Sequence, residues 1–197
     1  MKTGDHQWRT RQGRIGASEA GILTGSSGYG DPTSLYRRVL ALEEPGPSSI
    51  PQRMGNILEP VVLRAARDIF GLITTRCWRG YAHPDLPLSA SPDAYARPYG
   101  SYPAGIAEVK TTSAQWADQP PEYVLDQVQV QLLLTHKPVC HVIVLQGTML
   151  RLFQVEPDHQ RQELILDRVR EFTEGHLRPR VEPIRPPFQF LAPGENR

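Results

Sequence analysis

The chain has 197 residues, 39% of them hydrophobic, and a formal net charge of +1, which suits one globular domain and argues neither for nor against nucleic acid as a partner. No stretch approaches the roughly 18 apolar residues of a membrane helix, and the start MKTGDHQWRTRQG lacks the apolar centre of a signal peptide, so we expect a cytoplasmic protein. Cys77 and Cys140 belong to no cluster with zinc-ligand spacing, and two reduced, buried thiols are expected.

Helical patterns dominate the first 70 residues. Ser18 is suited to cap a helix over EAGILTG, and Pro32 fits the first turn of a second helix. The segment 43–52, EEPGPSSIPQ, predicts a loop. A third helix is expected from Gly55 to Phe70, with Pro60 in its first turn or at a bend.

From Leu72 the pattern becomes β-prone. The pieces ITTRCWRGYA, LPLSASPDAYA and GIAEVKTT predict a three-stranded meander, with a turn at 83–87. A helix then runs from Pro121 to about Thr135, VCHVIVLQG is a buried strand, MLRLFQVE is its hairpin or edge neighbour, and an amphipathic helix covers about 158–176. This order predicts the α/β class, with a central mixed β-sheet flanked by helices, in a single domain over 1–178 followed by a proline-rich tail over 179–197.

An acidic constellation carries the chemistry. Ser91-Pro-Asp93 precedes the predicted strand that holds Glu108-Val-Lys110. Side chains alternate along a strand, so Glu108 and Lys110 project to one side, and Asp93 brings a second carboxylate alongside. Oxygen ligands of this kind suit Mg²⁺ or Mn²⁺ and phosphodiester hydrolysis.

Taken alone, the Glu-x-Lys triplet is a weak signal. The alternative is an exposed ion pair on an edge strand, with Asp93 serving only as a turn former. The flanking motifs decide between the two interpretations.

In order along the chain, these motifs resemble the phage-type exonucleases related to lambda exonuclease and the YqaJ-like viral recombinases, a branch of the PD-(D/E)xK nuclease superfamily. The resemblance covers roughly residues 8 to 147, and Ala94 departs from it, because relatives often carry glycine there. The matching segments are Trp8, Arg11-Gln-Gly-Arg-Ile-Gly-Ala-Ser18-Glu19, Gly55-Asn-Ile-Leu-Glu59-Pro, Ser91-Pro-Asp93, Glu108-Val-Lys110-Thr, Tyr123, Gln127-Val-Gln129 and Thr135.

The resemblance implies a restriction-endonuclease-like core and a role for each matching residue. Asp93, Glu108 and the carbonyl of Val109 would hold Mg²⁺, in two ions, with Mn²⁺ as a substitute, and Lys110 would assist the attacking water. Glu59 resembles the family's additional carboxylate, although the helix dipole alone would also favour an acid near a helix start. Gln127 resembles the helix glutamine that contacts the site. Residues Arg11, Ser18 and Ser91 match positions that hold a terminal 5′ phosphate.

By the same resemblance we expect a hydrolase of duplex DNA ends, working 5′ to 3′ in the bacterial host of a phage or prophage. It would release 5′ mononucleotides and pass the 3′ single strand to an annealing protein during recombination, and a homotrimer is expected by analogy. Two alternatives stay open: a structure-selective or sequence-specific endonuclease with the same metal centre, and a catalytically silent DNA-binding module.

Two further groups of residues are ambiguous in the sequence. The glutamines 127, 129 and 131 cannot share one helix face, so at least one is expected to face solvent. Four aromatic residues could stack on bases, although core packing is the commoner fate: Tyr29, Tyr36, Trp78 and Trp116.

Overall fold

The computed structural model describes residues 13–27, 29–43, 47–97 and 104–184. Its helical elements are η1 (Ala17–Glu19), α2 (Ala20–Thr24), α3 (Pro32–Val39), α4 (Ile50–Phe70), α5 (Glu122–Thr135), α6 (His159–Phe172) and the π-helical turn η2 (Thr173–Leu177). Its strands are β1 (Ile15–Gly16), β2 (Thr74–Arg76), β3 (Tyr81–Ala82), β4 (Leu88–Ala90), β5 (Ala94–Ala96), β6 (Gly105–Thr112), β7 (Cys140–Gln146) and β8 (Met149–Val155).

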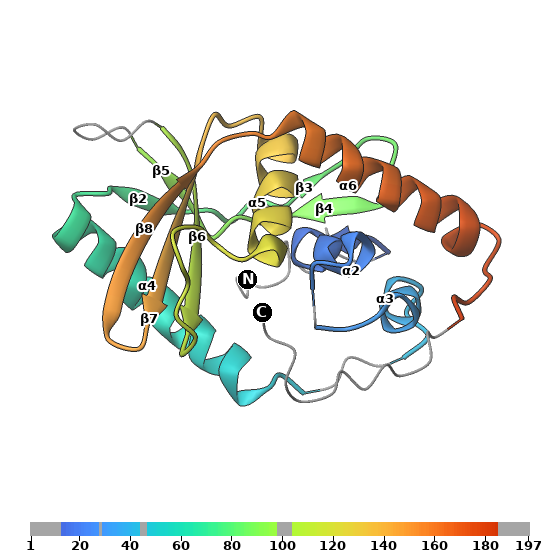
Figure 1. The fold of residues 1–197 in the computed structure, drawn as a ribbon, viewed down its shortest axis with the longest axis horizontal. Helices are drawn as coiled ribbons and strands as arrows, with labels where there is room; N and C mark the ends of the chain where they lie inside the picture. The colour runs from blue at the N-terminus through green and yellow to red at the C-terminus, as the bar shows by residue number, and fades with distance from the viewer. Residues whose placement is uncertain (1–12, 28, 44–46, 98–103, 185–197) are drawn as a thin grey trace.

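A five-stranded mixed sheet forms the centre of the fold. Its order is β2-β5-β6-β7-β8, in which β6 and β7 are parallel and the other neighbours antiparallel. Helix α4 packs on one face through Val62 and Ala66, whereas α5 packs on the other through Val124, Val128 and Leu132 (Figure 1). The predicted fold class, a mixed sheet flanked by helices, is confirmed.

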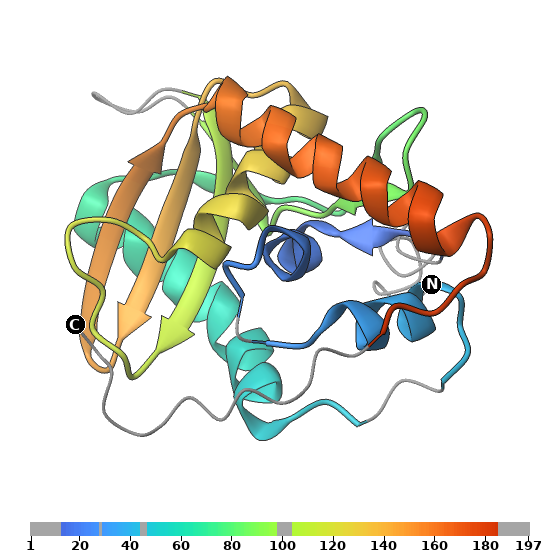
Figure 2. The ribbon, with the colours of Figure 1, turned by 45° about the vertical axis from the view of Figure 1, so that its right-hand side comes forward.

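A smaller region lies on the far side of α5. It combines the three-stranded sheet β1-β4-β3 with α2, α3 and α6 around a second core. Helix α5 runs between this region and the large sheet (Figure 2), and contributes Val130 to the second core. As a result, α5 is enclosed by protein on nearly every side.

The predicted three-stranded meander is wrong in its connectivity. Each of the first two β-prone pieces supplies one short strand to each sheet, so β2 and β5 join β6 while β3 and β4 pair with each other. Strands of two or three residues are too short to show a period, and β1, which pairs with β4, was not predicted at all. The turn at 83–87 is confirmed between β3 and β4.

The helix starts also differ from the sequence expectation. Ser18 lies exposed inside η1, where Gly16 is the N-cap and the Glu19 side chain accepts from its N–H, so the predicted Ser18 cap is wrong. Helix α4 begins at Ile50, inside the predicted loop, and is capped by Ser49. Pro60 therefore lies in the helix interior rather than in its first turn. Helices α3 and α5 begin and end close to the predicted positions.

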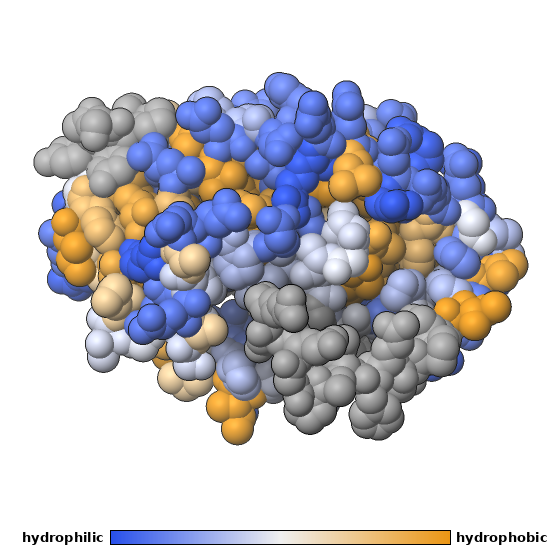
Figure 3. Space-filling view, in the orientation of Figure 1, coloured by the Kyte–Doolittle hydropathy of each residue, from blue (hydrophilic) through white to orange (hydrophobic). Residues whose placement is uncertain are grey.

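Helix α6 covers the upper edge of the molecule in Figure 1 with a mainly hydrophilic surface (Figure 3). The first part of the predicted tail, 179–184, runs back to α3, where Thr33 Oγ1 donates to the Pro183 carbonyl at 3.1 Å. Residues 185–197 of that tail lie outside the described part of the chain. None of the described helices combines the length and apolar character needed to cross a bilayer.

Candidate active site

The candidate site lies where β5 and β6 stop pairing. The last pair of the antiparallel ladder is Ala94 with Ala107, and Pro92, just upstream, has no N–H to donate. Beyond that pair, the Asp93 side chain replaces a backbone carbonyl as the acceptor, because its Oδ2 accepts from the Val109 N–H at 2.8 Å. Asp93 is thereby held against β6 beside Glu108.

Glu108 and Lys110 project from β6 toward α5, as their spacing predicts. Glu108 is only 3% exposed, and Lys110 Nζ donates to its Oε1 at 2.8 Å. Strand β6 has partners on both sides, β5 and β7. The alternative of an exposed pair on an edge strand is therefore excluded.

Helix α5 supplies two amides to the same carboxylate. Gln127 Nε2 donates to Glu108 Oε1 at 2.5 Å and Gln131 Nε2 donates to Oε2 at 2.7 Å, while Gln127 Oε1 accepts from Lys110 Nζ at 2.8 Å. The ammonium fixes the orientation of the Gln127 amide, since only the amide oxygen can accept from it. Glu108, Lys110 and Gln127 thus form a closed set of hydrogen bonds.

The expectation that one of the three glutamines faces solvent is wrong. Gln129 lies on the opposite side of α5 from Gln127 and Gln131, yet it is buried because the smaller region covers that side. Its amide donates to the Glu156 carbonyl and accepts from the Asp158 N–H, both at 2.9 Å. Sequence reasoning also missed the contact of Gln131 with Glu108, although its four-residue distance from Gln127 places both on one face.

Glu59 reaches this centre from the middle of α4. It is half-buried, lies nine residues after the first residue of the helix, and has the Arg76 guanidinium 3.6 Å away. Because dipole effects are confined to the terminal turns, the helix N-terminus does not account for this carboxylate. Glu59 is distinguished instead by its charge, which adds to burial in raising the pKa of Asp93, and by the charge of Glu108, which adds to burial in raising the pKa of Glu59.

The carboxylates of the site repel one another. Burial, and then the charge of Glu108, raise the pKa of Asp93 well above its usual range, and Glu59 adds to this rise. Burial also raises the pKa of Glu59, against the attraction of Arg76. For Lys110, burial lowers the pKa, but Glu108 and Asp93 outweigh it and the net shift is upward. Lys110 is therefore an ammonium at neutral pH.

This donor set fits a divalent cation with oxygen ligands. Within the described ranges, no group of three or more His, Cys, Asp or Glu side chains is arranged to hold a metal ion. Asp93 and Glu108 would instead act as a pair, completed by a backbone carbonyl and water, which is a donor set typical of Mg²⁺. Besides burial, the negative charges of Glu108 and Glu59 raise the pKa of Asp93, and a bound cation would offset these charges.

Ser91 and Ser18 follow the two paired parallel strands β4 and β1. Gly16 and Ser89 are partners in this pairing, and Ser18 and Ser91 each lie two residues after one of them, so the two serines leave the strands at the same level. The Ser91 hydroxyl is buried and makes no hydrogen bond to any described residue, which costs about 1–3 kcal/mol unless a ligand supplies a partner. Ser18 is exposed, and Arg11, the third residue predicted to hold a terminal phosphate, lies outside the described residues.

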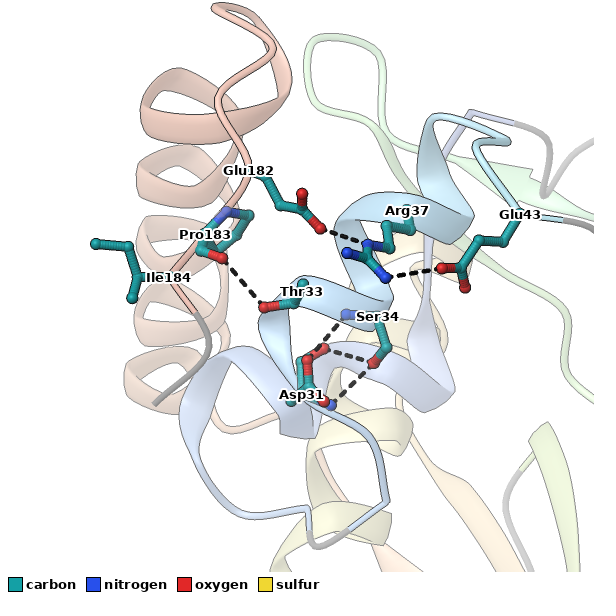
Figure 4. A pocket seen from close by; sticks show the side chains of 8 residues that line it. All are labelled: Asp31, Thr33, Ser34, Arg37, Glu43, Glu182, Pro183 and Ile184. Carbon is teal, nitrogen blue, oxygen red and sulfur yellow. Dashed lines mark hydrogen bonds and ion pairs between the residues drawn. The ribbon is translucent and has the colours of Figure 1, made fainter. Parts of the chain in front are cut away.

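A separate cavity of about 540 Å³ lies between α3 and residues 182–184. Figure 4 shows that its charged groups already face one another, with the Arg37 guanidinium between Glu43 and Glu182. The Asp31 carboxylate caps α3 through Ser34. None of the predicted site residues lines this cavity, so the carboxylate centre remains the candidate site.

No protein-family model matches the sequence, and no curated protein sequence does either. The fold, in contrast, is similar to solved structures of exonucleases. An alkaline exonuclease from Laribacter hongkongensis, solved in complex with dAMP, superposes with a TM-score of 0.67 at 18% identity over 86% of this chain and 90% of that chain. A phage-related exonuclease from Haemophilus somnus gives a TM-score of 0.61 at 10% identity over 82% and 92% of the two chains.

Proposed function

We propose that the protein is a metal-dependent exonuclease that digests one strand of duplex DNA from its 5′ end and releases 5′ mononucleotides. The observation that carries the proposal is the row of Asp93, Glu108 and Lys110 at the opening between β5 and β6, within a fold shared with exonucleases. Neither the fold nor the ion pair would suffice alone, because folds host many functions.

The proposal assigns the metal to Asp93 and Glu108, with the Val109 carbonyl as a further ligand and Glu59 serving a second ion. When bound, Mg²⁺ would polarise the phosphoryl oxygen and stabilise the negative charge that develops on it. Glu108 has lone pairs for this task, since a carboxylate offers about four acceptor sites and three are used by Lys110, Gln127 and Gln131.

Lys110 would hold the attacking water. Two of its three N–H groups are directed to Glu108 and Gln127, which leaves one without a partner among the described residues. Because the pKa of Lys110 is raised, it would act as a fixed positive charge and a hydrogen-bond donor rather than as a base. Gln127 keeps the ammonium in place.

Selection of the 5′ end is assigned to Arg11, Ser18 and Ser91. The unpartnered, buried Ser91 hydroxyl supports this assignment, since a phosphate oxygen would satisfy it. Phosphate contacts position the strand without reading its sequence, so little base specificity is expected.

The test is digestion of linear duplex DNA with Mg²⁺ or with a chelator, on substrates that carry either a 5′ phosphate or a 5′ hydroxyl. We expect Mg²⁺-dependent release of 5′ mononucleotides and a preference for the phosphorylated end. Lys110→Ala should abolish hydrolysis while DNA binding survives. Lys137→Ala is the matched control, because Lys137 lies on the loop between α5 and β7.

Closed circular DNA separates the remaining possibilities. Efficient cutting of closed circles would replace the exonuclease proposal with an endonuclease that uses the same centre. DNA binding without hydrolysis at any metal concentration would indicate a silent binding module.

Assembly is part of the same proposal. The exposed side of α4 carries an apolar stripe that a homotrimer could bury, made of Ile50, Met54, Ile57 and Val61. A mass measurement in solution tests the trimer, and pull-down with a single-strand annealing protein tests the partner.

A further inference from the structure

The four aromatic residues that were ambiguous in the sequence are clearly separated by the structure. Tyr36 and Trp116 are buried in the cores. Trp78 is 48% exposed, but the Arg76 guanidinium lies over its ring at 4.4 Å. Tyr29 is 75% exposed, and its described ring contact is with Tyr123. Of these four residues, Tyr29 is therefore the one whose ring surface is open to a ligand.

Tyr29 lies next to the catalytic row. Its ring meets Tyr123 edge-on, with centroids 5.6 Å apart and planes at 72°. Tyr123 precedes Gln127 by four residues on α5, so its side chain continues the helix face that carries Gln127 and Gln131 toward Glu108.

The loop that presents Tyr29 is anchored to α5. The hydroxyls of Thr24 and Ser26 donate to Asp126 Oδ2 at 2.6 and 2.5 Å, and Asp126 directly precedes Gln127 in the helix. The Ser27 hydroxyl then accepts from the Tyr29 N–H at 3.1 Å. A large apolar ring exposed on such an anchored loop contributes nothing to the cores.

We propose that Tyr29, supported by Tyr123, is a stacking platform for a nucleobase of the strand being cleaved, adjacent to the reacting phosphate. Every base has a π face, so the platform is tolerant of sequence but requires a base that has left its pair. This inference rests on the proposed function, because it takes DNA to be the substrate of the Asp93–Glu108 centre. It adds a contact to the base where the phosphate site supplies none.

Stacking is read out directly with 2-aminopurine, an adenine analogue whose fluorescence is quenched when it stacks. We would place it at each of the first three positions from a 5′-phosphorylated end, in oligonucleotides whose phosphorothioate linkages resist hydrolysis. Wild type and Tyr29→Phe, which keeps the ring, should quench one position. Tyr29→Ala should lose that quenching and bind roughly 5- to 150-fold more weakly. Trp78→Ala, which removes the other large aromatic side chain that is exposed among the described residues, should behave as wild type.

An abasic substrate tests the same contact in hydrolysis. An abasic site at the position where 2-aminopurine is quenched should slow digestion by wild type. The factor should equal that by which Tyr29→Ala slows digestion of intact DNA. Tyr29→Ala acting on the abasic substrate should be no slower than either change alone. If wild type hydrolyses DNA and Tyr29→Ala still quenches 2-aminopurine as wild type does, the stacking role of Tyr29 is wrong and the proposed function stands. Ring-dependent quenching without hydrolysis under any condition would support the platform and overturn the exonuclease, and failure of wild type to bind DNA would overturn both.

Discussion

Glu108, which contacts α5 from strand β6, and Asp126, which lies on α5, are two buried carboxylates with different surroundings. Asp126, 1% exposed, accepts from Arg161 Nε at 2.6 Å and from the hydroxyls of Thr24 and Ser26. Glu108 is held by Lys110 and two amides, and it also acts on other acids: burial, and then the charges of Glu108 and Glu59, raise the pKa of Asp93. Burial of a carboxylate is therefore not by itself a sign of function. A cluster of several acids around one ammonium group, that of Lys110, is the more informative sign of a functional site.

The largest effect should come from removing one charge of the crowded centre. Asp93→Asn keeps an oxygen for the Val109 N–H but removes a carboxylate that we propose binds the metal, so hydrolysis should fall by on the order of 10³-fold or more. Thermal stability should be unchanged or higher, because the repulsion is relieved. Initial rates and melting temperatures measure the two outcomes.

Asp118→Asn, on an exposed loop, is the matched control and should leave both quantities unchanged. Normal hydrolysis by Asp93→Asn would show that the centre is assigned to the wrong residues.

The opposite result is expected at the second carboxylate. Asp126→Ala removes the acceptor of Arg161 Nε and of two hydroxyls, while Glu122 still pairs with the guanidinium, so the free energy of unfolding in urea should fall by about 1–3 kcal/mol. The rate per folded molecule should fall far less than in Asp93→Asn, and by no more than in Tyr29→Ala, because Asp126 anchors the loop that carries Tyr29. Asp167→Ala removes an exposed ion pair with Arg170 and should cost less than about 1 kcal/mol. A stability loss for Asp126→Ala no larger than this control would contradict the comparison.

Two glutamines on opposite sides of α5 provide a finer test. Gln131→Leu removes one donor to Glu108 and, with it, a buried amide oxygen that has no partner among the described residues, so hydrolysis should fall by roughly 10- to 100-fold with little loss of stability. Gln129→Leu breaks bonds to the Glu156–Asp158 segment and should destabilise the fold with little effect on the rate. If the two variants changed the rate equally, the claim that only the Gln131 side of α5 serves the active site would be wrong.

The smallest effect is the pH dependence of the metal-free protein. A carboxyl whose pKa is raised on folding stabilises the folded state at low pH, and this contribution is lost as the pH rises from about 4 through the raised pKa. The melting temperature of wild type relative to Asp93→Asn should therefore fall as the pH increases. Mg²⁺ should remove this difference in melting temperature at neutral pH, since it binds the ionised carboxylate. If the melting temperature of wild type instead fell below that of Asp93→Asn as the pH decreased, the predicted direction would be wrong.

The sequence was sufficient where elements are long and periodic. The eight residues of β6, the helix α5 and the hairpin β7–β8 were all predicted, and with them the shared side of Glu108 and Lys110. It was insufficient where strands have two or three residues, because pairing across the chain decides their partners. The burial of Gln129 could not be predicted either, since it depends on a second region packing against α5.

Local rules also gave way to tertiary contacts in α4. The pattern predicted a helix from Gly55, with Pro60 in its first turn or at a bend, but the helix begins at Ile50 and continues through Pro60, and Val62 and Ala66 pack against the sheet. That continuity places Glu59 in mid-helix, close to the carboxylates. The position of this residue was found by resemblance rather than by the pattern of the helix.

The two-residue pairing of β1 with β4 has a kinetic consequence. The Ser89 hydroxyl donates to the Ile15 carbonyl across 74 positions of the chain, and Ser18 and Ser91 lie just beyond this junction. Closing so long a loop is slow and yields little until the surrounding helices have docked. We therefore expect the amide protons of this junction to exchange with deuterium earlier than those of β6 and β7, so that the two serines proposed to bind the 5′ end would belong to the part of the molecule that assembles last and opens first.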